Sequence, residues 1–429
     1  MPSVHEHHLP NGLTLLCCSL PHLHSVQFGL YLKGGSLYEN EQTQGISHLL
    51  EHLCFRGLGE LDHEQIGLLQ SRMGTDLNGA TYPEGIVFTM FALPRFFSDL
   101  LRLFRRFFLC TPWSGEVIRK EKQVVLRQVE QEEPDFEDEV VSRYRANLSG
   151  AFPVMGTVES VEALTPETIR LWQRMIFQPQ NACLCISGNF TKAMEATAVS
   201  LLSELSNYTE QPPFSQTMPQ GFCKRDAQSD WLSPEEGGQA RVHLAFDIDA
   251  DTVYPVMDEV ISAITAGSND SLLFQTLREE QTLVAEIESF IEETGSYRRL
   301  VISYDARQEV LCESLRAVFR LLQRLKMYIR PVRIMLSRMQ FTDNLAMYED
   351  SAAGMNEMMG WAWIADDMGQ CDLEAQARMY DDLTVEDLLD AAQAIFRPAA
   401  LTASVRYDPE FVREEELAEV LKECRGMLD

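Results

Sequence analysis

The fold and chemistry of this chain are indicated by one stretch, Gly45-Ile46-Ser47-His48-Leu49-Leu50-Glu51-His52-Leu53. It contains the pattern H-x-x-E-H. On a helix, residues four apart share a face, so the imidazoles of His48 and His52 can reach one metal ion. Glu51 lies on the same flank, where its carboxylate can act on a water bound to that ion. The pattern therefore predicts a metal-dependent hydrolase, with zinc as the cofactor.

Length, composition and charge indicate an acidic, packed globular protein. The 429 residues suit two domains of roughly 200 residues each, and a hydrophobic content of 45% argues against disorder. A net charge of −29 repels nucleic acid and anionic lipid, so neither is an expected partner. Part of this charge lies in residues 130–139, interpreted as a solvated helix end, with an acidic lining that selects basic peptides as the alternative.

The sequence predicts neither membrane insertion nor secretion. No apolar run reaches roughly 18 residues, and residues 1–11 contain no apolar signal segment. Cys17-Cys18 and Cys183-Leu184-Cys185 lie in apolar, strand-like runs, where reduced cysteine behaves as a small core residue. A cytoplasmic protein is expected. The terminal histidines His5, His7 and His8 are interpreted as a frayed polar end, with adventitious metal binding as the alternative.

Hydrophobic periodicity predicts both strands and helices in the first half. The expected strands are Leu13–Ser19, Val26–Leu32, Asp76–Tyr82 and Ile86–Leu93. The expected helices are Gln44–Phe55, His63–Met73, Pro94–Phe108, Ser114–Glu133 and a stretch near Phe136–Leu148. Strict β-α-β alternation is missing, which favours an α+β fold in which helices cover an antiparallel-rich sheet.

The chain also repeats itself. Leu164-Thr165-Pro166-Glu167 and Ile176-Phe177-Gln178-Pro179 correspond to Leu383-Thr384-Val385-Glu386 and Ile395-Phe396-Arg397-Pro398. Both matches are offset by 219 residues, since 384 minus 165 and 396 minus 177 give the same number. Two matches in phase indicate homologous halves, with the threonines as helix N-caps. A polar joint divides the chain into a first half-domain (1–207), a linker (208–236) and a second half-domain (237–429).

A zinc site needs a third protein ligand besides the two histidines. The candidate helix carries Glu121 and Gln128, which are seven residues apart and therefore share a face. Glu132 continues this face one turn further. The spacing alone leaves the choice among these side chains open.

The motifs, taken in order, resemble the pitrilysin, insulinase and mitochondrial processing peptidase family in its short form of two homologous half-domains. The resemblance covers nearly the whole chain. Gly45–Gly57 resembles the G-x-x-H-x-x-E-H-x-x-F-x-G core, and Lys33–Glu39 the G-S-x-x-E strand exit. Asn78–Thr81 resembles the N-A-x-T edge strand, Phe152–Gly156 the loop before a helix, and Ser271–Glu279 the pattern S-x-L-F-x-x-L-R-E.

The resemblance implies a role for each matched position. His48 and His52 would bind zinc, Gln128 would stand at the third ligand position, and Glu51 would be the general base and then the general acid. Glu121 would support the ligands without binding the ion itself. The backbone of an extended peptide would pair with the edge strand, and a second contact to substrate would come from the other half. The residues concerned are Asn78, Gly79, Ala80 and Thr81 on the strand, and Arg278 in the second half.

Two positions depart from the family pattern. Gln128 stands where the family has a glutamate, and a neutral amide oxygen is the weaker donor, so zinc should be held less tightly. A helix shift that brings in Glu130 or Glu132 instead is an alternative. Ala285 stands where the family has the tyrosine of an Arg–Tyr pair that holds substrate, although Arg278 is kept.

The resemblance therefore predicts a subunit of a zinc endopeptidase that cleaves unfolded peptides inside a dimeric chamber. A heterodimer with a related subunit that completes the site is favoured, and a homodimer stays open. Leader-peptide trimming is a role that the sequence permits. Because of Gln128, the alternative is a catalytically silent subunit that binds peptides or serves as a scaffold.

Overall fold

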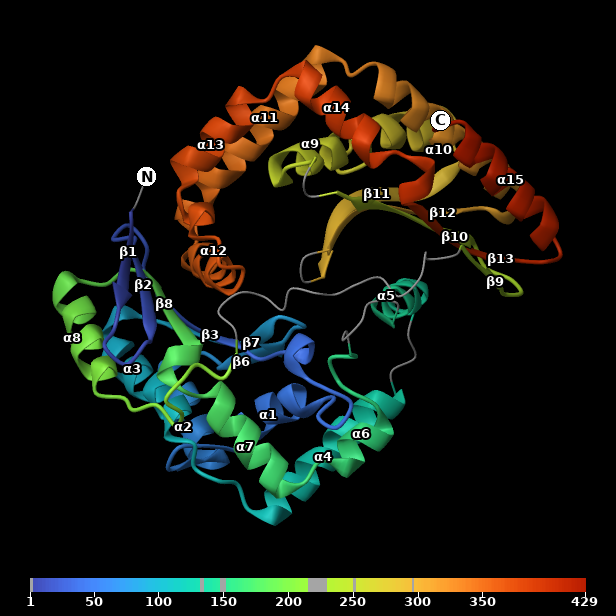
Figure 1. Cartoon of the computed structure of the whole chain (residues 1–429). Helices are drawn as coiled ribbons and strands as arrows, with labels where there is room; N and C mark the ends of the chain where they lie inside the picture. The colour runs from blue at the N-terminus through green and yellow to red at the C-terminus, as the bar shows by residue number, and fades with distance from the viewer. Residues whose placement is uncertain (1–2, 132–134, 147–151, 215–229, 250–251, 295–296) are drawn as a thin grey trace. The chain divides into compact units, whose positions relative to one another are not determined.

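The structure is a computed structural model that describes residues 3–131, 135–146, 152–214, 230–249, 252–294 and 297–429. The chain forms two compact units (Figure 1). The first unit comprises Met1–Glu133, Leu148–Cys223 and Asn344–Gln376, and the second comprises Pro134–Asn147, Lys224–Asp343 and Ala377–Asp429. Each unit thus includes one short segment from the other half of the chain. The middle of the expected linker, residues 215–229, lies outside the described residues.

The first unit contains a six-stranded sheet in the order β1-β2-β8-β3-β7-β6. Neighbouring strands are antiparallel, except that β2 and β8 run parallel. The strands are β1 (Val4–His8), β2 (Thr14–Ser19), β3 (Val26–Lys33), β6 (Asn78–Thr81), β7 (Gly85–Ala92) and β8 (Ala182–Gly188). Strands β4 (Gly57–Leu58) and β5 (Leu61–Asp62) form a separate small ladder. The interpretation of residues 5–8 as a frayed end is wrong, because β1 pairs along its length with β2.

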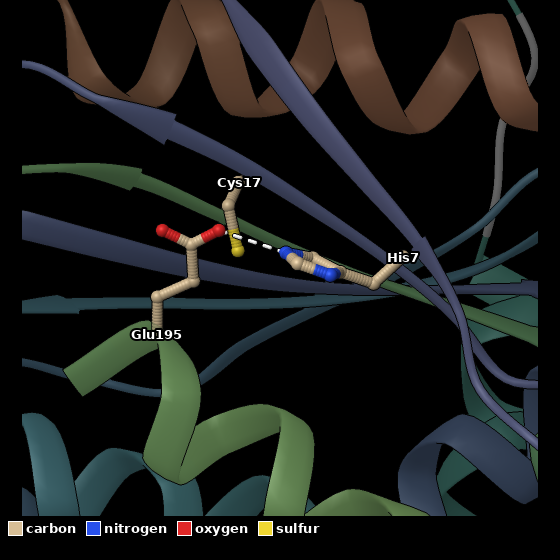
Figure 2. A group of neighbouring side chains, drawn as sticks. All are labelled: His7, Cys17 and Glu195. Atoms are coloured by element: carbon tan, nitrogen blue, oxygen red, sulfur yellow. Dashed lines mark hydrogen bonds and ion pairs between the residues drawn. The ribbon is translucent and has the colours of Figure 1, made fainter. Parts of the chain in front are cut away.

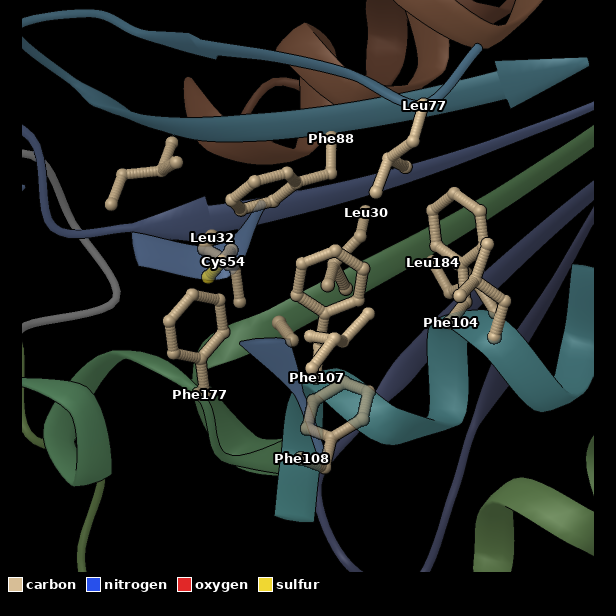
Figure 3. Packing of buried hydrophobic residues seen from close by; sticks show 14 of the residues in the cluster. Leu30, Leu32, Cys54, Leu77, Phe88, Phe104, Phe107, Phe108, Phe177 and Leu184 are labelled. Atoms are coloured by element: carbon tan, nitrogen blue, oxygen red, sulfur yellow. The ribbon is translucent and has the colours of Figure 1, made fainter. Parts of the chain in front are cut away.

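Helices of the first unit cover this sheet. They are α1 (Ile46–Cys54), α2 (His63–Met73), α3 (Phe97–Arg105), α4 (Gly115–Gln131), α6 (Val158–Ala163), α7 (Pro166–Ile176), α8 (Lys192–Ser203) and α12 (Ala352–Ile364). The helix expected at Pro94–Phe108 has 3-10 turns at both ends, Pro94–Phe96 and Arg106–Leu109. Aromatic rings from sheet and helices meet in the core (Figure 3), where Phe88 and Phe107 lie 4.4 Å apart between ring centroids.

The second unit contains a five-stranded sheet in the order β11-β12-β10-β13-β9. Its strands are β9 (Trp231–Pro234), β10 (Ala240–Ile248), β11 (Val284–Thr294), β12 (Tyr297–Ala306) and β13 (Leu401–Tyr407), and all neighbours except β13 and β9 are antiparallel. Its helices are α5 (Phe136–Ala146), α9 (Pro255–Thr265), α10 (Leu311–Met327), α14 (Val385–Ile395) and α15 (Glu414–Gly426). Helices α11 (Pro331–Met347) and α13 (Leu373–Asp382) each contain a boundary between the units.

The repeat found in the sequence is a repeat in structure. Helix α7, a 3-10 turn and β8 follow one another in the first unit, as do α14, a 3-10 turn and β13 in the second. All three elements keep the offset of 219 residues at both ends. The hydroxyl of Thr165 accepts from the backbone N–H of Thr168, and that of Thr384 from Asp387, so both predicted N-caps are confirmed. The α+β fold with antiparallel-rich sheets is also confirmed. Within the described residues, no helix has the length and apolar character that crossing a bilayer requires.

Helix α12 lies very close to the sheet of the first unit. A Cβ atom at Gly360 would lie 2.1 Å from Cζ of Tyr31 on β3, whereas a Cβ at Gly67 on α2 would meet nothing within 4 Å. We therefore expect Gly360→Ala to destabilise the fold by about 1–3 kcal/mol through overpacking. Gly67→Ala, the same change in an open helix, should stabilise by about 0.5–1 kcal/mol. Urea unfolding of both variants measures this, and equal midpoints would contradict the close packing of α12.

Candidate metal centre

Gly45 and Glu39 fix the residue at which helix α1, the carrier of the H-x-x-E-H motif, begins. Gly45 has φ 81°, and a Cβ there would lie 2.5 Å from the carbonyl oxygen of Met155, so only glycine fits. The buried carboxylate of Glu39 accepts from the backbone N–H groups of Gly45 (2.8 Å) and Ser47 (2.9 Å). Burial raises the pKa of Glu39 to about 7, although these hydrogen bonds act in the opposite direction. Glu39 thus caps the first turn, a role that the sequence analysis did not give it.

The second motif histidine is oriented by a carboxylate from helix α4. Nδ1 of His52 lies 3.1 Å from Oε1 of Glu121, and the other oxygen of Glu121 pairs with Arg56. Glu121 is only 3% exposed. Burial raises its pKa, but the His52 and Arg56 contacts prevail, so the pKa lies below the usual value and the group is ionised at neutral pH. A histidine that donates from Nδ1 to a carboxylate leaves Nε2 free to bind a metal.

Arg56 is a residue that the sequence analysis missed. It lies one helical turn after His52, and this spacing was visible in the sequence. The signal was weak, because nothing in the spacing says that both side chains converge on one distant carboxylate.

The first motif histidine lies next to Gln128. Nε2 of His48 is 3.4 Å from Oε1 of Gln128, and the rings of His48 and His52 are 4.6 Å apart between centroids. Two donors bound tetrahedrally to one zinc ion lie about 3.3 Å apart, so the spacing of these two atoms fits a shared ion. Burial, and then the neighbouring His52, lower the pKa of His48 to about 4, which keeps its ring neutral and able to bind a metal. Two imidazoles and an amide oxygen are thus a donor set that fits zinc.

The alternative ligands predicted on α4 were Glu130 and Glu132. Within the described residues, the exposed Glu130 makes no hydrogen bond or ion pair with either histidine, and Glu132 lies outside the described residues. The helix shift that would bring either of them to the ion therefore stays untested. Gln128 is the α4 side chain that the structure places against His48.

Glu51 is held by the edge strand β6. The hydroxyl of Thr81 donates to Oε2 of Glu51 at 2.7 Å, and Nδ1 of His48 lies 3.8 Å from the same oxygen. A Cβ atom at Gly79 would lie 3.1 Å from Cγ of Glu51 and 2.9 Å from the ring of Phe55, so glycine allows the strand to approach the helix. Burial raises the pKa of Glu51, against the opposing effects of the Thr81 hydrogen bond and His52. A carboxylate in this setting suits proton transfer.

The remaining substrate-binding candidates of β6 face away from Glu51. Because residues alternate along a strand, Gly79 and Thr81 face α1, while Asn78 and Ala80 face the opposite side. A cavity of about 290 Å³ is lined there by β6 and by Glu357 and Trp361 of α12, among others. Strand β6 is the last in the order of its sheet, so its outer edge pairs with no strand among the described residues. An outer edge of this kind can accept an extended peptide.

Arg278 belongs to the second unit, whereas the motif residues belong to the first. Its guanidinium lies 4.7 Å from the ring centroid of Phe274, in a π-helical segment, Phe274–Glu280. It lines a cavity of about 320 Å³ together with acidic side chains of the same unit, namely Glu137, Glu286, Glu288 and Asp305. Part of the acidic run is therefore in contact with other side chains and is not simply solvated. For example, Glu137 accepts from Ser303, and Glu139 pairs with Arg406 at 2.8 Å.

Comparison with known proteins identifies the family. The family model described as "Insulinase (Peptidase family M16)" matches residues 16–154, and the one described as "Peptidase M16 inactive domain" matches residues 163–331. The chain belongs to peptidase family M16. The resemblance inferred from the motifs is confirmed. The match described as inactive covers Arg278 but none of the H-x-x-E-H residues, which lie in the first match.

The relatives of this M16 chain include proteins named as zinc proteases. It is 24% identical over 411 residues to an uncharacterized zinc protease of Rickettsia bellii, and the match covers 92% of this chain and 96% of that protein. It is 27% identical over 161 residues to the β subunit of the mitochondrial processing peptidase of Neurospora crassa, covering 37% and 34% of the two chains.

Solved structures show the same fold. A protease of Helicobacter pylori superposes with a TM-score of 0.82 at 16% identity, over 95% of this chain and all of that chain. A Pseudomonas fluorescens protein described as a peptidase M16 inactive domain gives a TM-score of 0.81 at 15% identity, over 95% and 98% of the two chains.

The replacement Gln128→Glu should strengthen zinc binding, because a carboxylate adds a negative charge to the donor set. We expect a gain in affinity of at least about tenfold. Gln123→Glu, the same change at an exposed position of α4, is the matched control and should leave the affinity unchanged. Competition against a fluorescent zinc chelator measures both variants. Equal affinities of the two variants would contradict a ligand role for Gln128.

The replacement Glu121→Gln should weaken zinc binding by about 10–100-fold, because His52 loses the charged group that orients it. Its effect should exceed that of Gln123→Glu in the same competition assay. Unchanged affinity would mean that the contact between His52 and Glu121 does not act on the ligand.

Proposed function

We propose that this chain is the metal-bearing subunit of a zinc-dependent endopeptidase that cleaves unfolded peptides. The observation that carries the proposal is the approach of Gln128 Oε1 to within 3.4 Å of His48 Nε2, beside the oriented ring of His52. This contact joins two helices that are far apart in the sequence at one potential ion site. The names of the zinc protease relatives support the same reading.

The side chains suggest how the reaction would proceed. Bound zinc would polarise the scissile carbonyl and make an attacking water more acidic. One carboxylate oxygen of Glu51 would accept the proton of that water and pass it to the leaving amine. Thr81 holds this carboxylate in place through its 2.7 Å hydrogen bond. The outer edge of β6 would bind the peptide backbone, so that recognition depends little on peptide side chains.

The proposal includes a related partner subunit. Ala285 lies at a bulge in the pairing of β11 with β12 and supplies no phenol near Arg278. In this proposal, the tyrosine hydroxyl that helps to hold the substrate would come from the partner chain. Relatives from Neurospora crassa and Saccharomyces cerevisiae are named as β subunits of the mitochondrial processing peptidase, and these names support a partner for this chain. We favour a heterodimer whose chamber admits unfolded peptides, and leader-peptide trimming would be one use of it.

A silent peptide-binding subunit is the second candidate. The neutral amide of Gln128 favours it, because no carboxylate in the donor set offsets the charge of the ion. Zinc content distinguishes the two candidates. Stoichiometric zinc that is lost in His52→Ala supports the enzyme, whereas a metal-free chain that still binds peptides supports the silent subunit.

Glu51→Gln should abolish hydrolysis and leave zinc binding within about twofold of the parent, because Glu51 moves protons and is not a ligand. A library of unstructured fluorogenic peptides, cleaved by the chain mixed with a related M16 subunit, provides the assay. Glu64→Gln, on the exposed side of α2, is the matched control and should retain full activity. Retained activity in Glu51→Gln would overturn the proposed mechanism, and full activity of the chain without a partner would overturn the divided site.

A further inference from the structure

Four potential metal ligands meet at the opposite edge of the first unit's sheet, on the edge strand β1. His5 and His7 come from β1, Cys17 from β2, and Glu195 from helix α8. None of these residues belongs to the H-x-x-E-H site. From the sequence alone, the histidines were interpreted as a frayed end, with adventitious metal binding as the alternative, and Cys17 as a core residue. Only the strand register brings Cys17 and the histidines together.

The pairing of β1 with β2 explains why these side chains converge. His5 is paired with Cys17, and His7 with Leu15. Residues that face each other across antiparallel strands project from the same side of a sheet, as do residues two apart on one strand. His5, His7 and Cys17 therefore share the face that holds the hydrophobic core, which includes Cys17 and Leu15. The neighbours Cys18 and His8 point to the other face.

Helix α8 adds a carboxylate to this face. Thr191 caps the helix, and Glu195 follows in the first turn, where it is 8% exposed. Figure 2 shows His7, Cys17 and Glu195 pointing toward one another. Their ligand atoms all lie within 4.8 Å of one another. Nε2 of His7 is 2.8 Å from Oε1 of Glu195, and Nδ1 of His5 is 3.2 Å from the same oxygen.

We propose that His5, His7, Cys17 and Glu195 form a second, structural zinc site. Two nitrogens, a sulfur and a carboxylate oxygen are ligands that tetrahedral zinc accepts. A thiolate and a carboxylate together carry two negative charges, which balance the charge of Zn²⁺ where Cys17 and Glu195 are buried, while the two histidines lie toward solvent. Binding would release the thiol proton of Cys17 to solvent. The ligand atoms of His7, Cys17 and Glu195 lie within 4.8 Å of one another and would have to approach by about 1 Å to share one zinc ion. His5, which contacts Glu195 at 3.2 Å, would have to turn its ring toward the same ion.

The site would fix the edge of the sheet. Strand β1 pairs only with β2 among the described strands, so one side of it lacks the backbone hydrogen bonds that an inner strand makes. One ion bound by β1, β2 and α8 would hold all three elements together. A closed set of four protein ligands also leaves no position for substrate, which is the property of a structural site and not of a catalytic one.

Cobalt in place of zinc tests the proposal in the full-length chain. The background His48→Ala/His52→Ala removes the H-x-x-E-H site, so that remaining metal binding reports on the second site. A cysteine ligand produces a thiolate-to-Co²⁺ charge-transfer band in the near ultraviolet, which the histidines and amide of the other site cannot produce. Cys17→Ser is the test variant. Cys18→Ser is its matched control, since both cysteines are buried on β2 and only Cys17 faces the cluster.

The proposal expects one equivalent of Co²⁺ with the thiolate band in the background variant and in Cys18→Ser, and loss of the band in Cys17→Ser. His7→Ala and Glu195→Gln should weaken cobalt binding by about tenfold or more, and these two variants decide the matter if Cys17→Ser does not fold. Zinc should raise the Tm of the background variant but not that of His7→Ala. Three results would overturn the second site. The band could be absent from the background variant, it could persist in Cys17→Ser, or His7→Ala could bind cobalt as tightly as the background variant does.

Discussion

The candidate active site depends on one partly buried contact, the hydrogen bond between Nδ1 of His52 and the carboxylate of Glu121. It joins α1 to α4, and these two helices carry the three proposed zinc ligands of this site. Because Arg56 neutralises the other oxygen of Glu121, the carboxylate can be buried without an unpaired charge. The contact fixes which nitrogen of His52 faces the ion. The position of Gln128 against His48 follows, because Gln128 lies two turns further along the same face of α4.

Two glycines and a capping carboxylate determine the distances between the other groups of the candidate active site. Gly45 and Glu39 determine where α1 begins, and Gly79 determines how closely β6 approaches Glu51. These residues position helix α1 and strand β6, and none of them is proposed to bind the metal or to transfer a proton. A shift of α1 by a fraction of a turn would separate Glu51 from Thr81 and His48 from Gln128 together, so the general base and the ligands are positioned by one set of constraints.

The sequence was sufficient where local rules decide the structure. The spacing within H-x-x-E-H predicted a shared helix face, and the in-phase repeat predicted the matching caps at Thr165 and Thr384, because helix periodicity and capping are properties of neighbouring residues. The exchange of α5 and α12 between the units could not be predicted, since it depends on contacts of high sequence separation. The hydrogen bond from Thr81 to Glu51 and the convergence of His5 with Cys17 required the strand register, which spacing along the chain does not specify.

Gln128, which stands where the family has a glutamate, links the affinity of the site for zinc to the proposed hydrolysis. A donor set without negative charge would hold zinc less firmly, so the proposed activity would depend on how fully the site is loaded with metal. Anomalous diffraction from crystals grown with zinc tests this account most directly. The account predicts a zinc peak about 2.0–2.2 Å from Nε2 of His48, Nε2 of His52 and Oε1 of Gln128. A peak bound to both histidines with Gln128 turned away, or no peak between them at saturating zinc, would contradict it.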